Sequence, residues 1–182
     1  GIPLVPHFQY PENAKVVFLP TQAAKDNNIF SKIEKSLNNG ATMVFTTGFL
    51  ANTENGKQIA ELAGVEYPIE VAPIKADGII NNGIYETVLH GLDLEGTPVL
   101  TNGKSLLNAV ADSKQIPFFI KSEYKTGTVF TLNSHTFSQV DFDAVGEVLL
   151  CPKPLGLLEI PETWSNIVRN EIVKPLNFEL LA

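Results

Sequence analysis

The hydrophobic pattern near the start of the chain predicts two short strands. An apolar, β-branched run at Lys15–Leu19 ends at Pro20, and a second apolar run follows at Thr42–Thr46. The polar stretch Thr21–Lys25 after the first run predicts a loop. We expect the two strands to lie buried in one sheet.

A helix is predicted between these strands, from Asp26 to Asn38. Asp26 is a residue type that favours the helix N-cap, and Asn39 and Gly40 provide a stop. Apolar residues recur at helical spacing on one face: Ile29, Phe30, Ile33 and Leu37. We expect the first three of them to be nearly fully buried against the sheet. The strand, the helix and the second strand then form a βαβ unit with parallel strands and a right-handed crossover.

The middle of the chain changes from helical to strand periodicity. A short helical stripe at Ile59, Leu62 and Ala63 ends at Gly64. Beyond it the pattern indicates a β-rich insertion or edge around residues 65–125, with turns at Asp77-Gly78 and Asn82-Gly83. Short strands are predicted there at Ile69–Ile74, Ile79–Ile80, Tyr85–Leu89 and Pro98–Leu100.

The last third of the chain combines strands with one amphipathic helix. Strands are predicted at Leu107–Ala111, Phe118–Lys121 and Thr128–Leu132, and a polar loop follows at Asn133–Val140. After a Pro-rich segment, a helix begins at Pro161 and carries an apolar face of Trp164, Ile167, Val168 and Ile172. We expect this helix to cover either the sheet or a partner chain.

Together these elements predict an α/β fold, with a flavodoxin-like, doubly wound and mostly parallel sheet and a β-rich insertion. The sequence shows no internal repeat and no linker, so residues 1–182 are interpreted as a single domain. The chain starts at Gly1 and its one Met is Met43, so we expect a domain excised from a longer, processed protein. Its compartment stays open; we favour an extracytoplasmic one (periplasmic or secreted), with which the scarcity of cysteine is compatible.

Composition and charge exclude several classes of function. The 13 Lys and Arg residues are outnumbered by 20 Asp and Glu residues, and without a basic cluster this balance argues against nucleic acid and anionic membranes as partners. Apolar runs are far shorter than the roughly 20 residues that span a bilayer. His7, His90 and His135 lack metal-ligand spacing, the one cysteine is Cys151, and no phosphate-binding glycine motif occurs. We therefore expect no metal and no cofactor.

Candidate site residues follow the predicted strands, because reacting groups in a doubly wound sheet lie beyond the carboxyl ends of the strands. These residues are Thr21, Gln22, Thr46, Thr47, Ser134 and His135. A hydroxyl at Thr47 or Ser134 with the His135 imidazole would suit a small hydrolase. However, a nucleophile elbow needs a glycine two residues before the nucleophile, and Phe45 stands there. We therefore favour turn and cap roles for these residues.

Two stretches resemble a known family. The segment Val16–Leu50 resembles the opening of a class I glutamine-amidotransferase-like domain, up to the turn that carries the nucleophile. The segment Gly127–Phe137 resembles the late strand and loop where the amidotransferases carry their catalytic His and Glu. The chain is most similar to non-catalytic versions inside bacterial carbohydrate-processing proteins, such as the trimerisation domain of certain β-galactosidases. The resemblance implies the fold.

The departures from this family argue against its activity. The turn reads Thr46–Phe49, with no Cys where the enzymes place one, and Phe137 replaces the late acid two residues after His135. Asp141 or Asp143 would have to supply that acid. We therefore expect no catalytic residue, and a non-catalytic interaction or assembly module whose partners are other domains of a parent protein or like subunits. The alternatives are the small hydrolase, and a ligand-binding domain at the degenerate active-site position.

Overall fold

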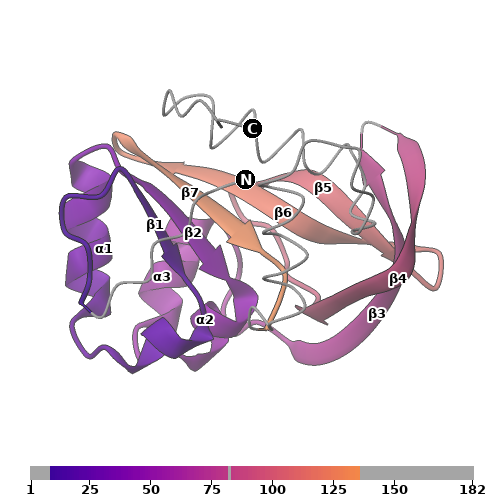
Figure 1. Ribbon diagram of the computed structural model, residues 1–182, viewed down its shortest axis with the longest axis horizontal. Coiled ribbons are helices and arrows are strands. Elements are labelled where there is room, and N and C mark those ends of the chain that lie inside the picture. Colours follow the sequence, from indigo (N-terminus) through magenta and orange to yellow (C-terminus); the bar gives the residue numbers. More distant parts are fainter. Residues whose placement is uncertain (1–8, 82, 136–182) are drawn as a thin grey trace, which may run out of the picture.

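The computed structural model describes residues 9–81 and 83–135 (Figure 1). Several predictions fall outside these residues: the helix after Pro161, the loop beyond His135, and the candidate acids Asp141 and Asp143. In the described part, seven strands form one sheet in the order β1-β2-β7-β6-β5-β3-β4. Their bounds are Val16–Leu19 for β1, Thr42–Thr46 for β2, Val71–Asn81 for β3, Ile84–Gly96 for β4, Lys104–Ala111 for β5, Lys114–Tyr124 for β6 and Gly127–Leu132 for β7.

The amino-terminal βαβ unit is confirmed. Strands β1 and β2 pair in parallel, with Val17 opposite Met43, and helix α1 (Ile29–Asn38) connects them. The helix starts later than predicted, because residues Thr21–Lys25 form a 3-10 helix, η1, rather than a loop. Asp26 is therefore not the N-cap. Its carboxylate accepts a hydrogen bond from the Asn28 amide at 3.0 Å and pairs with Lys32 at 2.5 Å.

The expectation of a mostly parallel sheet is wrong. Only the β1–β2 and β2–β7 pairs in the described sheet are parallel, and the other four pairs are antiparallel. The reason is local: short turns after Ala111 and Tyr124 join β5, β6 and β7, whereas a parallel neighbour needs a long crossover. The sheet is therefore mixed, and the domain is an α/β fold with a sheet-rich character.

The β-rich insertion is confirmed, and its first part forms two long strands rather than several short ones. Strands β3 and β4 form an antiparallel hairpin, and Gly83 adopts a φ of 82° at its turn, a conformation that glycine favours. Asp77-Gly78 is not a turn, because it lies inside β3 at a shift of register. The predicted strand Pro98–Leu100 reduces to one bridge between Leu100 and Val65.

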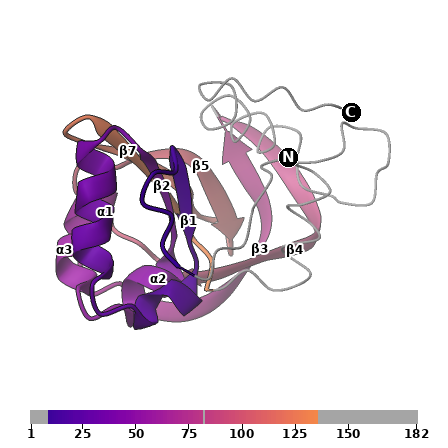
Figure 2. The same cartoon turned by 60° about the vertical axis from the view of Figure 1, so that its left-hand side comes forward.

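Two hydrophobic clusters lie on opposite sides of the central strands, as the alternation of side chains along a strand requires. Met43 and Phe45 of β2 face the first cluster, and Val44 faces the second. The helices α1, α2 (Thr47–Asn52) and α3 (Gly56–Ala63) all pack into the first cluster, on one side of the sheet (Figure 2).

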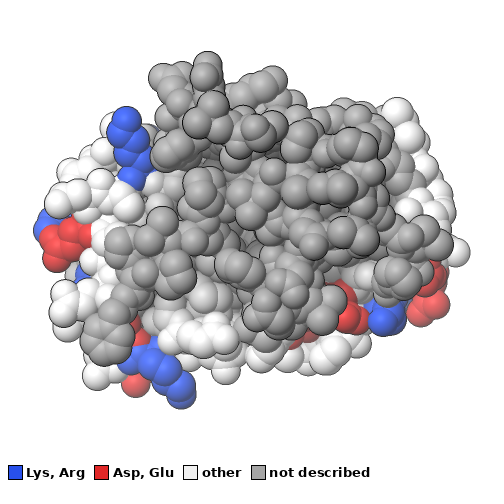
Figure 3. Space-filling view, in the orientation of Figure 1, with Lys and Arg blue, Asp and Glu red and all other residues white. Residues whose placement is uncertain are grey.

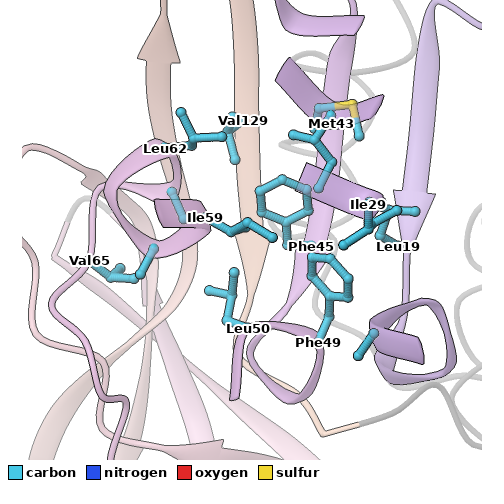
Figure 4. Close-up of a cluster of buried hydrophobic side chains, with 14 of the residues drawn as sticks. Leu19, Ile29, Met43, Phe45, Phe49, Leu50, Ile59, Leu62, Val65 and Val129 are labelled. Carbon is cyan, nitrogen blue, oxygen red and sulfur yellow. The ribbon is translucent and has the colours of Figure 1, made fainter. Parts of the chain in front are cut away.

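Aromatic pairs mark the centre of each cluster. Phe45 and Phe49 lie side by side in the first cluster, with ring centroids 5.4 Å apart (Figure 4). Phe119 and Phe130 stack in the second, with ring centroids 5.2 Å apart. In α1, the prediction of burial holds for Ile29 and Ile33, whereas Phe30 is only partly buried.

Charged groups of both signs are interspersed on the face that Figure 3 displays, near the helices at one end and near the β3–β4 hairpin at the other. Examples of mixed pairs are Lys35 with Glu12 at 2.6 Å and Lys75 with Asp93 at 3.7 Å. Within the described residues, none of the helices has the length and apolar character that crossing a membrane requires.

Candidate functional site

The candidate site lies where β2 and β7 end. These strands pair in parallel, with Thr46 opposite Leu132, so the turns that follow them meet at one edge of the sheet. The structure brings together five of the six predicted residues there: Thr21, Thr46, Thr47, Ser134 and His135. The sixth, Gln22, is an exposed residue of η1.

Thr46 serves as the N-cap of α2. Its side-chain oxygen accepts a hydrogen bond from the Phe49 amide at 3.0 Å, and the residue is fully buried. This cap satisfies one of the amides that a helix start leaves without a partner. The predicted cap role at this turn is therefore confirmed for Thr46.

The Ser134 carbonyl joins the two turns. It lies 3.0 Å from the Thr47 hydroxyl and 3.0 Å from the Gly48 amide, both of which are donors to it. The Thr47 hydroxyl also lies 3.2 Å from the Asn133 side-chain oxygen, and the Thr47 residue is 0% exposed. Both contacts are with acceptors inside the protein, so the one hydroxyl proton of Thr47 points toward the interior and away from solvent.

Gly48 is needed for this close approach. A Cβ atom at Gly48 would lie 1.8 Å from the His135 carbonyl oxygen, which is far inside van der Waals contact. The Thr21 hydroxyl donates a hydrogen bond to the same carbonyl. Helix η1, the turn after β2 and the end of β7 therefore meet at one point that only a glycine leaves open.

Asn133 connects the site to the β-rich part of the sheet, a role that its position in the sequence does not indicate. Its side-chain nitrogen donates to the Gly96 carbonyl at 2.8 Å and to the Pro117 carbonyl at 3.0 Å. Its side-chain oxygen accepts from the Gly96 amide at 3.4 Å. The residue is fully buried, so these bonds replace those it would make with water.

Glu95 is the second residue that sequence reasoning missed. Its carboxylate oxygen lies 2.7 Å from Nδ1 of His135. The Glu95 side chain is 4% exposed and the His135 side chain is 55% exposed. No local motif could have found this pair, because the two residues are 40 positions apart and meet only where the end of β4 lies close to the end of β7.

The Glu95 carboxylate fixes which nitrogen of His135 carries a proton. A carboxylate accepts but does not donate, so Nδ1 carries the hydrogen and the lone pair of a neutral imidazole is on Nε2. A carboxylate therefore lies beside the His135 imidazole, and it comes from β4 and not from the position two residues after His135. In the part of the chain that the structure describes, no group of three His, Cys, Asp or Glu residues could hold a metal ion.

Two shallow hollows lie away from this site, beside the loop before β1, the first at the start of α1 and the second at its end. One is lined by Gln9, Tyr10, Glu12, Asp26 and Lys32, and the other lies next to Ser36 and Gly40. Burial raises the pKa of the Tyr10 phenol, and its hydroxyl lies 2.9 Å from that of Ser36. The hydrogen bond from the Lys32 ammonium lowers the pKa of the Asp26 carboxyl.

Comparison of the sequence with protein-family models and with curated proteins found no match. The fold is similar to that of the cytoplasmic protein STM1381 from Salmonella typhimurium LT2, with a TM-score of 0.51 and 13% identity. That match covers 86% of this chain and 71% of the other. At this identity it shows the fold alone.

Structures of the GH42 β-galactosidase Gan42B from G. stearothermophilus also match. For a catalytic mutant the TM-score is 0.48 at 14% identity, over 74% of this chain and 21% of that enzyme. This chain therefore spans about a fifth of the length of the β-galactosidase. At this TM-score the match is a partial likeness, and no conclusion about this chain rests on it.

Proposed function

We propose that this chain is a non-catalytic interaction or assembly module of a larger bacterial, carbohydrate-processing protein. In this proposal its partners are other domains of the parent protein or like subunits, not nucleic acid or a membrane. In this proposal the chain is related to the glutamine-amidotransferase-like domains. The resemblance of Val16–Leu50 and Gly127–Phe137 supports this relationship, as does the parallel pairing of β2 with β7, which brings the two segments together.

One observation carries the non-catalytic part of the proposal: the Ser134 carbonyl accepts from both the Thr47 hydroxyl and the Gly48 amide. A nucleophile at this turn needs an accessible oxygen and a base. The amide of the residue after the nucleophile is the usual donor to the oxyanion. Here the hydroxyl is buried and the amide is bonded internally, so both groups hold the fold together.

An assay of the whole chain tests this proposal. Purified protein is incubated with glutamine and with a panel of activated esters, next to the variants Thr47→Ala and His135→Ala. We expect no turnover above the buffer blank in any of them. Thr42→Ala is the matched control, because it removes a threonine hydroxyl at the opposite end of β2. Turnover that is lost in Thr47→Ala and His135→Ala but kept in Thr42→Ala would overturn the proposal.

The assembly part has its own measurement. Sedimentation velocity over a range of protein concentrations reports whether the chain associates with itself. Concentration-dependent oligomers would support like subunits as the partner. A monomer at the highest accessible concentration would remove like subunits from the proposal and leave docking onto another domain.

The Glu95–His135 pair favours a second candidate function, a small hydrolase. An imidazole oriented by a carboxylate is the general base of the serine hydrolases, where loss of the carboxylate lowers the rate by about 10⁴. In this candidate His135 would activate a water molecule, since the Thr47 hydroxyl points inward. Turnover that survives Thr47→Ala but disappears in both His135→Ala and Glu95→Gln would establish it.

A further inference from the structure

The second hydrophobic cluster lies on a face of the sheet that the described helices do not cover. Its buried residues all belong to strands, and Phe119 of β6 stacks on Phe130 of β7 at its centre. Helices α1, α2 and α3 all pack into the first cluster, and none of them contributes a residue to the second. Figure 2 shows these three helices together on one side of the sheet.

The side chains of the second cluster are nevertheless buried. Phe119 is 2% exposed and Phe130 is 1% exposed. A sheet buries an apolar face by packing it against a second layer of structure, and a large apolar face left in water is rare in a folded protein. The second face of this sheet therefore needs a layer that helices α1, α2 and α3 do not provide.

We propose that residues 136–182 of the same chain provide this layer, and that the amphipathic helix predicted from Pro161 lies across β6 and β7. The sequence pattern alone allows this helix to cover either the sheet or a partner chain. The gathering of the described helices on one side favours the sheet, because the other side offers a ready apolar surface. This inference goes beyond the proposed function, since it needs neither an activity nor a partner.

The chain leaves the sheet next to the second cluster. Leu132, the last residue of β7, belongs to that cluster. Residues 136–160 can span about 80 Å when extended, so they can bring the helix to any part of the face. A helix is about 10–12 Å wide and neighbouring strands lie about 4.8 Å apart, so one helix covers about two strands. Strands β6 and β7 carry all the buried phenylalanines of the cluster, so this pair offers the helix the largest apolar side chains.

The fluorescence of Trp164, the one tryptophan of the chain, tests this inference in the whole protein. Cys151→Ser removes the one native thiol, and a nitroxide quencher is attached to a cysteine introduced by Leu106→Cys. Leu106 lies on β5, the neighbour of β6, and packs against the second cluster. Ser31→Cys is the matched control, because Ser31 is exposed on α1, on the other side of the sheet. We expect the label at position 106 to cause a strong loss of tryptophan emission that urea reverses, and the label at position 31 to cause none.

A mixing experiment separates the chain's own helix from that of a second copy. Chains that carry the label at position 106 together with Trp164→Phe are mixed with unlabelled chains that keep Trp164. We expect no loss of emission in the mixture. Quenching between different chains would show that the helix covers a partner, and would overturn the inference.

A pair of unlabelled variants tests the face of the helix that packs. Ile167→Asp places a charge on the apolar face, so we expect the emission of Trp164 to shift to longer wavelength as water reaches the ring. Asn166→Asp introduces the same side chain on the opposite face and should leave the emission unchanged. Equal shifts in the two variants, or no quenching by the label at position 106, would overturn the inference.

Discussion

Small polar side chains determine how the carboxyl ends of β2 and β7 meet. Thr46 uses its side-chain oxygen as a helix cap, Thr47 donates to the neighbouring turn, and Asn133 bonds to two other segments. All three are fully buried, so each bond replaces a bond to water. Thr46 and Thr47, two of the candidate site residues, therefore have structural roles that explain their identity.

Thr131 is an exception to this rule and provides a residue-scale prediction. Its hydroxyl is buried and has no hydrogen-bond partner among the described residues. Thr131→Val removes the unsatisfied group and adds a residue that favours strands, so we expect the free energy of unfolding to stay equal or rise by up to about 1 kcal/mol. The matched control, Thr46→Val, loses a cap and should cost about 1 kcal/mol. Urea unfolding measures both free energies. A clear loss of stability in Thr131→Val would contradict the description of this hydroxyl as buried without a partner.

Tyr10 provides a prediction about pH. Burial raises the pKa of its phenol, so the folded protein disfavours the phenolate. The neutral phenol therefore makes its full contribution to the stability of the folded state below the ordinary pKa of about 10. This contribution is lost as the pH rises through the higher pKa of the folded state. We therefore expect the wild type to lose stability relative to Tyr10→Phe between about pH 9 and about pH 11. A difference that stays constant across this range would show that the phenol does not titrate in this way.

At the scale of elements, the sequence predicted what depends on local pattern. The βαβ unit, helix α3 with its cap at Gly64 and the strands β5, β6 and β7 follow from hydrophobic spacing and turn residues. The hairpin of β3 and β4 was divided wrongly, because Asp77-Gly78 has the composition of a turn although neighbouring strands hold it extended. Propensity is a weak signal where pairing to other strands decides the conformation.

Helix α1 allows a test of the packing that these patterns imply. Ile33 is 0% exposed and lies in the first hydrophobic cluster. Ile33→Ala removes buried methyl groups and leaves a cavity, so we expect a loss of about 2–5 kcal/mol in the free energy of unfolding. Ser31→Ala changes an exposed residue of the same helix and should alter stability by less than about 0.5 kcal/mol. Equal effects of the two substitutions would mean that this face of α1 does not pack as described.

At the scale of the whole molecule, the candidate site depends on contacts between distant parts of the chain. The sequence identified Thr47 and His135 as neighbours, because both follow strands that resemble one family. It could not identify Glu95 or Asn133, since their roles arise only when the end of the long strand β4 comes close to the residues that follow β7. Likewise, the orientation of the strands in the sheet depends on the connections between them, and hydrophobic spacing does not report it.

Gly48 tests this convergence of distant segments. In Gly48→Ala the new methyl group would meet the His135 carbonyl at 1.8 Å, so the turns after β2 and β7 would have to separate. We expect a loss of at least about 2 kcal/mol in the free energy of unfolding. Gly83→Ala is the control, because nothing lies within 4 Å of its Cβ and only its positive φ makes the substitution unfavourable, by about 1 kcal/mol. A Gly48→Ala protein as stable as the Gly83→Ala protein would contradict the close contact.

The position of β7 has a consequence for how the protein is made. This strand is the last described one in the chain, yet it lies between β2 and β6 in the sheet. A ribosome therefore releases β1, α1 and β2 long before β7, the second neighbour of β2, exists. In the meantime Met43 and Phe45 lack part of their packing. Contacts of such high sequence separation slow folding and leave apolar surface open to aggregation. A nascent chain stalled before Gly127 should therefore be captured by chaperones, whereas one that has released Leu132 and the residues after it should resist protease.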